Sequence, residues 1–286
     1  SGIDRPMFGA LLHGSVCRDF LEPATACRVH HGLELPSECM IYDVSNACLG
    51  LLNGMIQVAS MIELGQIRAG IVVGTECGRE LVENTIALLN NDLSATRESI
   101  KHSIASLTIG SASVAMVLCD EELSRTGNRL TSAMVHCDTS QHDLCQSRGM
   151  ETMMQTDSEE LMRRGIAVGA ETFGRFLAVS GWEASEIDRT FCHQVGVAHR
   201  KLMFDSLGLH PAIDFATLET LGNTGSAALP ITMAMGIEQG RLRRGDRVAM
   251  LGIGSGINCL MLGAEWQTSP LREQGKSLAG TAGSKS

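Results

Sequence analysis

Short apolar runs that alternate with helical patterns are the feature that most constrains how this 286-residue chain can fold. Two of them, AGIVVGT at 69–75 and ASVAMVLC at 112–119, have the length and the branched side chains of buried strands. Segments with helical periodicity separate such runs, which is typical of α/β proteins. Strands are predicted at 9–15, 39–45, 69–75, 112–119, 130–138, 189–195, 214–219, 247–252 and 258–264, and helices at 23–34, 47–64, 159–179, 197–207 and 225–239.

These elements form two corresponding halves. Each half reads strand, helix, strand, helix, strand, strand, but the second half opens with one additional strand and a long helix. A strand–helix unit of this kind takes on the order of 30 residues. We therefore predict an incomplete first half at 1–125, a second half at 126–266 and a disordered tail at 267–286. The missing unit is expected to be absent from this chain or supplied by another one.

Composition excludes several classes of protein. The net charge of −9 and the aromatic content of 3% argue against nucleic-acid binding, which needs clustered basic and stacking side chains. No apolar run approaches the ~18 residues of a membrane span. Ten cysteines occur without a CxxC pair or a secretory leader, so reduced thiols and a cytoplasmic location are expected. No metal-ligand spacing is present, and no metal site is expected.

Cys48 is the candidate nucleophile. It follows the strand that ends in Asp43-Val44-Ser45 and stands at the start of a helix rich in small residues. The positive end of a helix dipole favours the thiolate, so we expect a lowered pKa at this position. A small buried core residue is the alternative interpretation, and for any single cysteine among ten it is the commoner one.

Two further polar residues stand at comparable junctions between strand and helix. His193 lies where a predicted strand ends, and Asn223 precedes a helix of small residues. Taken alone, each has a structural explanation: His193 could be a core histidine whose hydrogen bonds are satisfied, and Asn223 could cap the helix that follows it. Together with Cys48 they would supply a thiol, a proton carrier and an amide donor to one pocket, because open α/β sheets gather functional groups at the carboxyl ends of their strands.

Four segments resemble the thiolase-superfamily condensing enzymes of the β-ketoacyl synthase III type. They are DVSNACLGLLNG, CHQVG, LGNTGSAALP and GIGSGINCLMLG, and the resemblance spans about residues 9–266. The resemblance implies a duplicated thiolase-like fold, with two mixed five-stranded sheets and helices between and outside them, of which the first half here lacks its opening unit. It also implies a homodimer and no cofactor beyond a coenzyme A thioester that serves as substrate.

The same resemblance assigns roles to residues. Cys48 would accept an acyl group, and His193 and Asn223 would hold the carbonyl of the second thioester during a Claisen condensation. The amides of Cys48 and Ser255 would form the oxyanion hole, with Gly254 and Gly256 in the substrate-binding turn. A dinucleotide-binding role for this glycine turn is rejected, because the glycines lie between two strands rather than between a strand and a helix.

The wording of the motifs is closer to the olefin-pathway branch of this family, which joins two long acyl-CoA chains. Val195-Gly196 follow Gln194, where the fatty-acid-initiating members usually read Ala-Asn. In the olefin branch a glutamate of the partner subunit acts as base, and Glu22 occupies the matching place; a carboxylate that favours a helix N-terminus is its alternative interpretation.

Two alternatives remain open from the sequence. One is an initiating synthase that takes a short acyl-CoA and malonyl acyl carrier protein. The other is a truncated or split chain that serves as a non-catalytic subunit, which the missing opening unit suggests.

Overall fold

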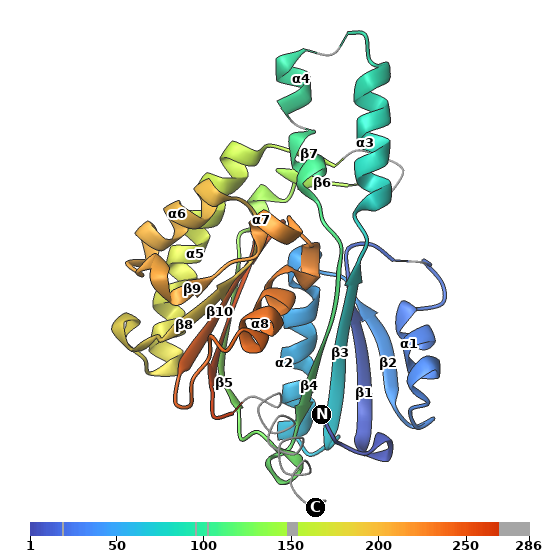
Figure 1. Ribbon diagram of the computed structural model, residues 1–286, viewed down its shortest axis with the longest axis vertical. Coiled ribbons are helices and arrows are strands. Elements are labelled where there is room, and N and C mark those ends of the chain that lie inside the picture. The colour runs from blue at the N-terminus through green and yellow to red at the C-terminus, as the bar shows by residue number, and fades with distance from the viewer. Residues whose placement is uncertain (19, 95, 102, 148–153, 269–286) are drawn as a thin grey trace, which may run out of the picture.

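Two β-sheets lie on either side of a central helix layer (Figure 1). The computed structural model describes residues 1–18, 20–94, 96–101, 103–147 and 154–268. Within those residues the first sheet has four strands, of which β4 runs antiparallel to β3 while the others are parallel. Their order is β2 (Met40–Val44), β1 (Phe8–Gly14), β3 (Ala69–Glu76) and β4 (Ala112–Cys119).

The second sheet has five strands in the described part of the chain. Its parallel members are β8, β9 and β10, whereas β11 runs antiparallel to both of its neighbours. Five strands here and four in the first sheet agree with the prediction that the first half has one strand fewer. The order is β5 (Arg129–Cys137), β11 (Asn258–Glu265), β10 (Arg247–Gly254), β8 (Arg189–Cys192) and β9 (Asp214–Phe215).

Helices form the middle layer and both outer layers. Between the sheets lie α2 (Gly50–Glu63) and α8 (Ala228–Glu238), whose side chains belong to one apolar cluster with the inner faces of both sheets. A helix between two sheets must be apolar on most sides, which explains why α2 buries Leu51, Leu52, Met55 and Val58. The outer layers are α1 (Thr25–Leu33) on the first sheet, and α5 (Ser158–Ser180) and α6 (Val197–Leu207) on the second.

The remaining elements are short or lie at the periphery. Figure 1 shows α3 (Arg79–Asn91) and α4 (Arg97–Lys101) projecting beyond the carboxyl end of β3. Among the described residues, no helix has the length and apolar character needed to cross a membrane. The other elements are the hairpin β6 (Cys145–Gln146) and β7 (Gln155–Thr156), helix α7 (Leu218–Leu221), and the 3₁₀ turns η1 (Arg5–Met7), η2 (Ala47–Leu49), η3 (Ile104–Thr108), η4 (Glu121–Leu123), η5 (Thr139–Gln141), η6 (Ala184–Glu186), η7 (Pro211–Ile213) and η8 (Gly225–Ala227).

Several predicted boundaries were wrong. The predicted helix at 47–64 divides into η2 and α2, and the strand predicted at 189–195 ends at Cys192. The strand predicted at 214–219 ends at Phe215, because the N–H groups of Thr217 and Leu218 bond to a side chain instead of a neighbouring strand. All but the first two residues of the predicted tail, 267–286, lie outside the described residues.

We predict that Gly14→Ala destabilises the protein. A Cβ at Gly14 would lie 2.6 Å from the carbonyl carbon of Gly50 and 2.7 Å from the amide nitrogen of Leu51, so α2 would have to move away from β1. Overpacking of this kind costs about 1–3 kcal/mol of unfolding free energy, measured here by urea denaturation. Gly32→Ala is the matched control, because nothing lies within 4 Å of its added Cβ; there we expect no loss. Equal stability of the two variants would contradict the close approach.

Candidate active site

Cys48 lies in η2, the 3₁₀ turn that connects β2 to α2. The residue before it, Ala47, has φ +45°, a left-handed conformation that is uncommon for residues other than glycine. Such conformations cost free energy and cluster at functional sites. The turn therefore presents Cys48 ahead of the first residue of α2 rather than inside the helix, and the side chain is half-buried.

The glycine turn of the second half packs directly on this cysteine. A Cβ added at Gly254 would lie 3.6 Å from both the Cβ and the amide nitrogen of Cys48, and one added at Gly252 would clash with Leu49 at 2.7 Å. Small residues at these positions allow η2 to lie against β10. The structure thus gives Gly254 a packing role beside the substrate-binding role that the sequence suggested.

Ser255 and Gly256 belong to the same loop cluster. Asn258 Nδ2 donates to the carbonyl oxygen of Ser255 at 3.2 Å and to Asn46 Oδ1 at 3.1 Å. A Cβ at Gly256, which has φ +133°, would lie 2.5 Å from Asn258 Nδ2. The asparagine contacts therefore join the turn that follows β10 to the residue two positions before Cys48.

His193 comes directly after β8, and its backbone N–H donates to Leu251 O of β10 at 3.2 Å. Because Cys192 pairs with Leu251, His193 lies at the same end of the sheet as Gly254. The side chain is only 7% exposed, and its Nδ1 has no hydrogen-bond partner among the residues that the structure describes. Burial, with the nearby His199, lowers the pKa of His193 to about 3, so the imidazole is neutral at physiological pH.

Asn223 lies between α7 and η8, in backbone contact with the first half. Its N–H donates to Thr108 O at 2.9 Å and its carbonyl accepts from Gly110 N–H at 2.8 Å. The side-chain Oδ1 accepts from Gly225 N–H at 3.0 Å, which leaves Nδ2 as the end that can donate to a ligand. Because η8 packs against η2, the turn that follows Asn223 lies beside the Cys48 turn.

The expected low pKa of Cys48 is not found. Burial raises the pKa of this thiol to about 12, and the nearby Cys145 and Glu76 act in the same direction. The expectation rested on a helix N-terminus, but α2 begins two residues later and desolvation outweighs the dipole. At physiological pH the site therefore holds a protonated thiol and a neutral imidazole.

Glu22 is the one exposed residue among the four predicted catalytic residues. It is exposed on the loop between β1 and α1, and among the described residues no hydrogen bond or ion pair joins it to Cys48, His193 or Asn223. The single chain thus brings together the Cys48 turn, the glycine turn and the turn after Asn223, with His193 on the neighbouring strand end.

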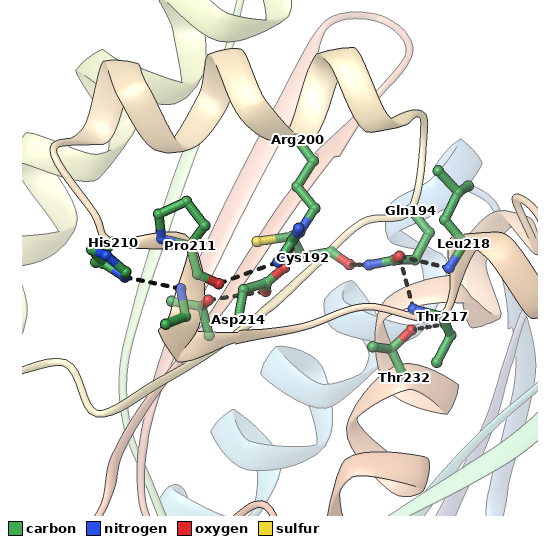
Figure 2. Close-up of polar contacts among 11 residues, drawn as sticks. Cys192, Gln194, Arg200, His210, Pro211, Asp214, Thr217, Leu218 and Thr232 are labelled. Atoms are coloured by element: carbon green, nitrogen blue, oxygen red, sulfur yellow. Dashed lines mark hydrogen bonds and ion pairs between the residues drawn. The ribbon is translucent and has the colours of Figure 1, made fainter.

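Sequence reasoning missed Gln194, which fixes the loop around His193 (Figure 2). Its Nε2 donates to Cys192 O at 2.8 Å, and its Oε1 accepts from the N–H groups of Thr217 and Leu218, both at 3.1 Å. These contacts connect the end of β8 to the start of α7, the helix that leads to Asn223. The only feature of the sequence that could have indicated this role of Gln194 was its polar side chain next to His193.

An ion pair between the partly exposed Arg200 and the buried Asp214 supports the same strand (Figure 2). Asp214 of β9 accepts from Arg200 Nε of α6 at 2.6 Å and from Thr190 Oγ1 at 3.0 Å. Burial raises the pKa of Asp214, and the contact with Asp214 helps to raise that of the buried Cys192 thiol. Cys192 lies within β8 and packs in an apolar cluster of the second sheet, which indicates a structural thiol; Cys48 remains the candidate nucleophile.

We predict that the alkylation rate of Cys48 keeps rising far into alkaline pH. The thiolate is the reactive form, and its fraction grows about tenfold per pH unit until pH reaches the pKa, which is about 12 here. Iodoacetamide labelling from pH 7 to 10, with quantification of the Cys48 peptide by mass spectrometry, measures this. The alkylation rate of a free cysteine levels off above its pKa of about 8.5 and serves as the reference. A plateau for Cys48 below pH 9 would contradict the burial effect.

Comparison with known proteins identifies the family to which the chain belongs. Residues 177–266 match the C-terminal domain of 3-oxoacyl-[acyl-carrier-protein] synthase III. An acyl-CoA:acyl-CoA alkyltransferase of Shewanella oneidensis is 42% identical over 93% of this chain and 78% of its own length. The enzyme of the same name from Xanthomonas campestris is 37% identical over 93% of this chain and 77% of its own length. β-Ketoacyl-[acyl-carrier-protein] synthase III of Pseudomonas aeruginosa is 25% identical over 87% of this chain and 73% of its own length.

Solved structures agree with the sequence comparison. A crystal structure of Xanthomonas campestris OleA superposes with a TM-score of 0.88 at 36% identity, covering 92% of this chain and 76% of that one. Structures of OleA include variants in which a cysteine, a histidine or a glutamate is replaced, a complex with cerulenin, and one with lauric acid and lauroyl-CoA. The chain therefore belongs to the acyl-CoA:acyl-CoA alkyltransferase family of thiolase-like condensing enzymes.

Proposed function

We propose that this protein joins two acyl-CoA molecules in a Claisen condensation that proceeds through an acyl group on Cys48. The observation that carries the proposal is the meeting of the Cys48 turn with the Gly254 strand end and the turn after Asn223. That arrangement occurs in a chain 42% identical to an acyl-CoA:acyl-CoA alkyltransferase. Lauroyl-CoA, which is bound in a structure of OleA, represents the proposed long-chain substrate class.

In the first step the Cys48 sulfur attacks the thioester carbonyl of one acyl-CoA. We assign the role of base for the thiol proton to the imidazole of His193, which is neutral in the resting protein. As the proton leaves, the bond between the carbonyl carbon and the coenzyme A sulfur breaks. Coenzyme A leaves with the proton. We assign the amides of Cys48 and Ser255 to the negative oxygen of the tetrahedral intermediate, and the turn of Gly254 and Gly256 to substrate binding.

In the second step the α-carbon of another acyl-CoA attacks the acyl-enzyme. Asn223 Nδ2 and His193 hold its carbonyl oxygen while a base removes an α-proton, so the enolate charge develops against two donors. A carbon–carbon bond forms, the carbon–sulfur bond to Cys48 breaks, and the thiol regains a proton. The product is a 3-oxoacyl thioester, and its hydrolysis gives a β-keto acid. The two thioesters balance the condensation, and one water molecule balances the hydrolysis, so we propose no further cofactor.

We propose that Glu22 of a second copy of the chain is the base that removes the α-proton, which makes the enzyme a homodimer. Glu22 is too exposed in its own chain to serve a buried site, and its neighbours Phe20 and Leu21 are 50% and 96% exposed. Apolar side chains of that size on one loop favour contact with another surface. Cysteine, histidine and glutamate, the residue types replaced in the OleA structures, are also the types assigned here.

Two features of the proposal concern partners and location. The initiating synthases that use acyl carrier protein are more distant, at 25% identity against 42%, so we favour coenzyme A as the carrier of both acyl groups. Nucleic acid is not a proposed partner. A cytoplasmic location is proposed because the ten cysteines are unpaired, as expected in a reducing compartment.

The central prediction concerns Cys48. Incubation with lauroyl-CoA is expected to add one lauroyl group to this residue and to yield the β-keto product. Cys48→Ala removes the nucleophile, so the adduct disappears and the rate falls on the order of 10⁴-fold. Intact-protein mass spectrometry and product analysis measure both. Cys145→Ala is the control, since Cys145 is the neighbouring thiol and has no assigned role. An adduct that survives in Cys48→Ala would refute the assignment.

The dimer prediction uses complementation. Cys48→Ala and Glu22→Gln are each expected to be inactive, but a mixed dimer pairs the intact Cys48 of one chain with the intact Glu22 of the other. After subunit exchange of an equal mixture, half of the dimers are mixed and each has one working site of two. Activity should therefore recover to about a quarter of that of the wild type. If Glu22 acted within its own chain, mixing would restore nothing.

A further inference from the structure

Glu76 is a buried carboxylate that the mechanism above does not use. It is the last residue of β3 and is 5% exposed. Its Oε1 accepts from Val16 N–H at 2.8 Å and from Ser226 N–H at 3.0 Å. Its Oε2 accepts from Cys17 N–H at 3.1 Å and from the Cys17 thiol at 3.0 Å. One carboxylate thus joins two segments that come from opposite halves of the chain.

Backbone N–H groups, rather than a cationic side chain, compensate the buried charge of Glu76. Among the described residues, no lysine, arginine or histidine forms an ion pair with it. Burying a carboxylate is expensive unless donors surround it, and backbone N–H groups supply that compensation here. Because those donors come from fixed backbone, the carboxylate in turn fixes where the two segments lie.

One of these segments carries Asn223. Gly225 has φ +54°, and a Cβ there would lie 2.8 Å from Glu76 Oε1, so the turn lies directly on the carboxylate. Gly225 N–H donates to Asn223 Oδ1, which orients the amide. Ser226 Oγ lies 2.7 Å from Glu76 Oε1 and 2.8 Å from Gly14 O, and its single proton can serve one of them at a time. Moving Glu76 would therefore move the turn that sets the direction of Asn223 Nδ2.

The other segment carries Glu22. Val16 and Cys17 begin the loop between β1 and α1, on which Glu22 lies exposed. The thiol of Cys17 is held by the same carboxylate, and burial together with this hydrogen bond raises its pKa to about 12. The start of the loop is thus anchored at the same point as the Asn223 turn.

We propose that Glu76 is a positioning residue for the condensation step, which orients the Asn223 amide and anchors the Glu22 loop without touching substrate. The inference rests on the proposed function, because Asn223 and Glu22 are assigned to the second step there. Acylation needs Cys48 and its oxyanion hole, neither of which hydrogen-bonds to Glu76. Loss of Glu76 should therefore separate the two steps.

The test measures the two steps separately in the 286-residue chain with lauroyl-CoA. In Glu76→Gln one of the two oxygens becomes an NH₂ group that faces N–H donors, so the Ser226 turn or the Cys17 loop must shift. A misplacement of about 1 Å costs on the order of 100-fold in rate. We expect condensation to fall by about that factor while single-turnover acylation of Cys48 stays within about threefold of wild type. Glu76 raises the pKa of Cys48, so acylation should not slow for want of thiolate.

Two variants complete the design. Glu76→Asp keeps the charge but shortens the reach, and it should show the same separation of steps. Thr172→Val is the control for the loss of a buried polar group. The Thr172 hydroxyl, in α5, is buried and donates to Val168 O within its own helix, so its removal should change neither step. If the Gln variant does not fold, Ser226→Ala removes one donor and should lower condensation alone, by a smaller factor.

Three outcomes would overturn the inference. They are an equal fall in acylation and condensation, no fall in either step, and a separation of steps that also appears in Thr172→Val. Failure of the proposed function is distinguishable from these, because the wild-type chain itself would then show no lauroyl adduct on Cys48.

Discussion

The site depends on glycines that allow η2 and α2 to lie close against the neighbouring strands β1 and β10. Gly14 lies under Gly50 where α2 crosses β1, and Gly252 and Gly254 lie under Leu49 and Cys48 where η2 meets β10. A methyl group at several of these contacts would overlap main-chain atoms or the cysteine turn. Since α2 is held between two sheets, the start of that helix has one available position. Close packing therefore places Cys48, the proposed nucleophile, and buried groups around it set the pKa of its thiol.

The electrostatics of the site favour neutral partners before reaction. Burial raises the pKa of Cys48 to about 12 and lowers that of His193 to about 3. Each shift disfavours a charge in the resting protein, and each therefore makes a proton transfer from thiol to imidazole costly in the absence of substrate. In the proposed mechanism the oxyanion donors and the incoming thioester supply the compensation only when charge develops, which is the condition for selective stabilisation of a transition state.

Much of this arrangement was predictable from local patterns. The strands at 112–119 and the helix at 197–207 were predicted with the observed bounds, and the family motifs contain Cys48, His193 and Asn223. The pKa of Cys48 was predicted in the wrong direction, because sequence shows a helix start but not the desolvation around one sulfur. Glu76 was missed for a related reason, since its donors lie 60 and 150 residues away along the chain. Gln194 ends a strand early through a side-chain contact that no periodicity records.

The duplication explains why a single carboxylate can serve both halves. Cys48 follows the first half's second strand, while in the second half His193 follows the end of β8 and Asn223 follows α7. Chemistry at one point therefore requires the halves to keep a fixed relation within a fraction of an ångström. Apolar packing between α2 and α8 is non-directional and tolerates sliding, whereas the hydrogen bonds of Glu76 do not. A directional contact at the boundary between the halves supplies the precision that the shared apolar core cannot.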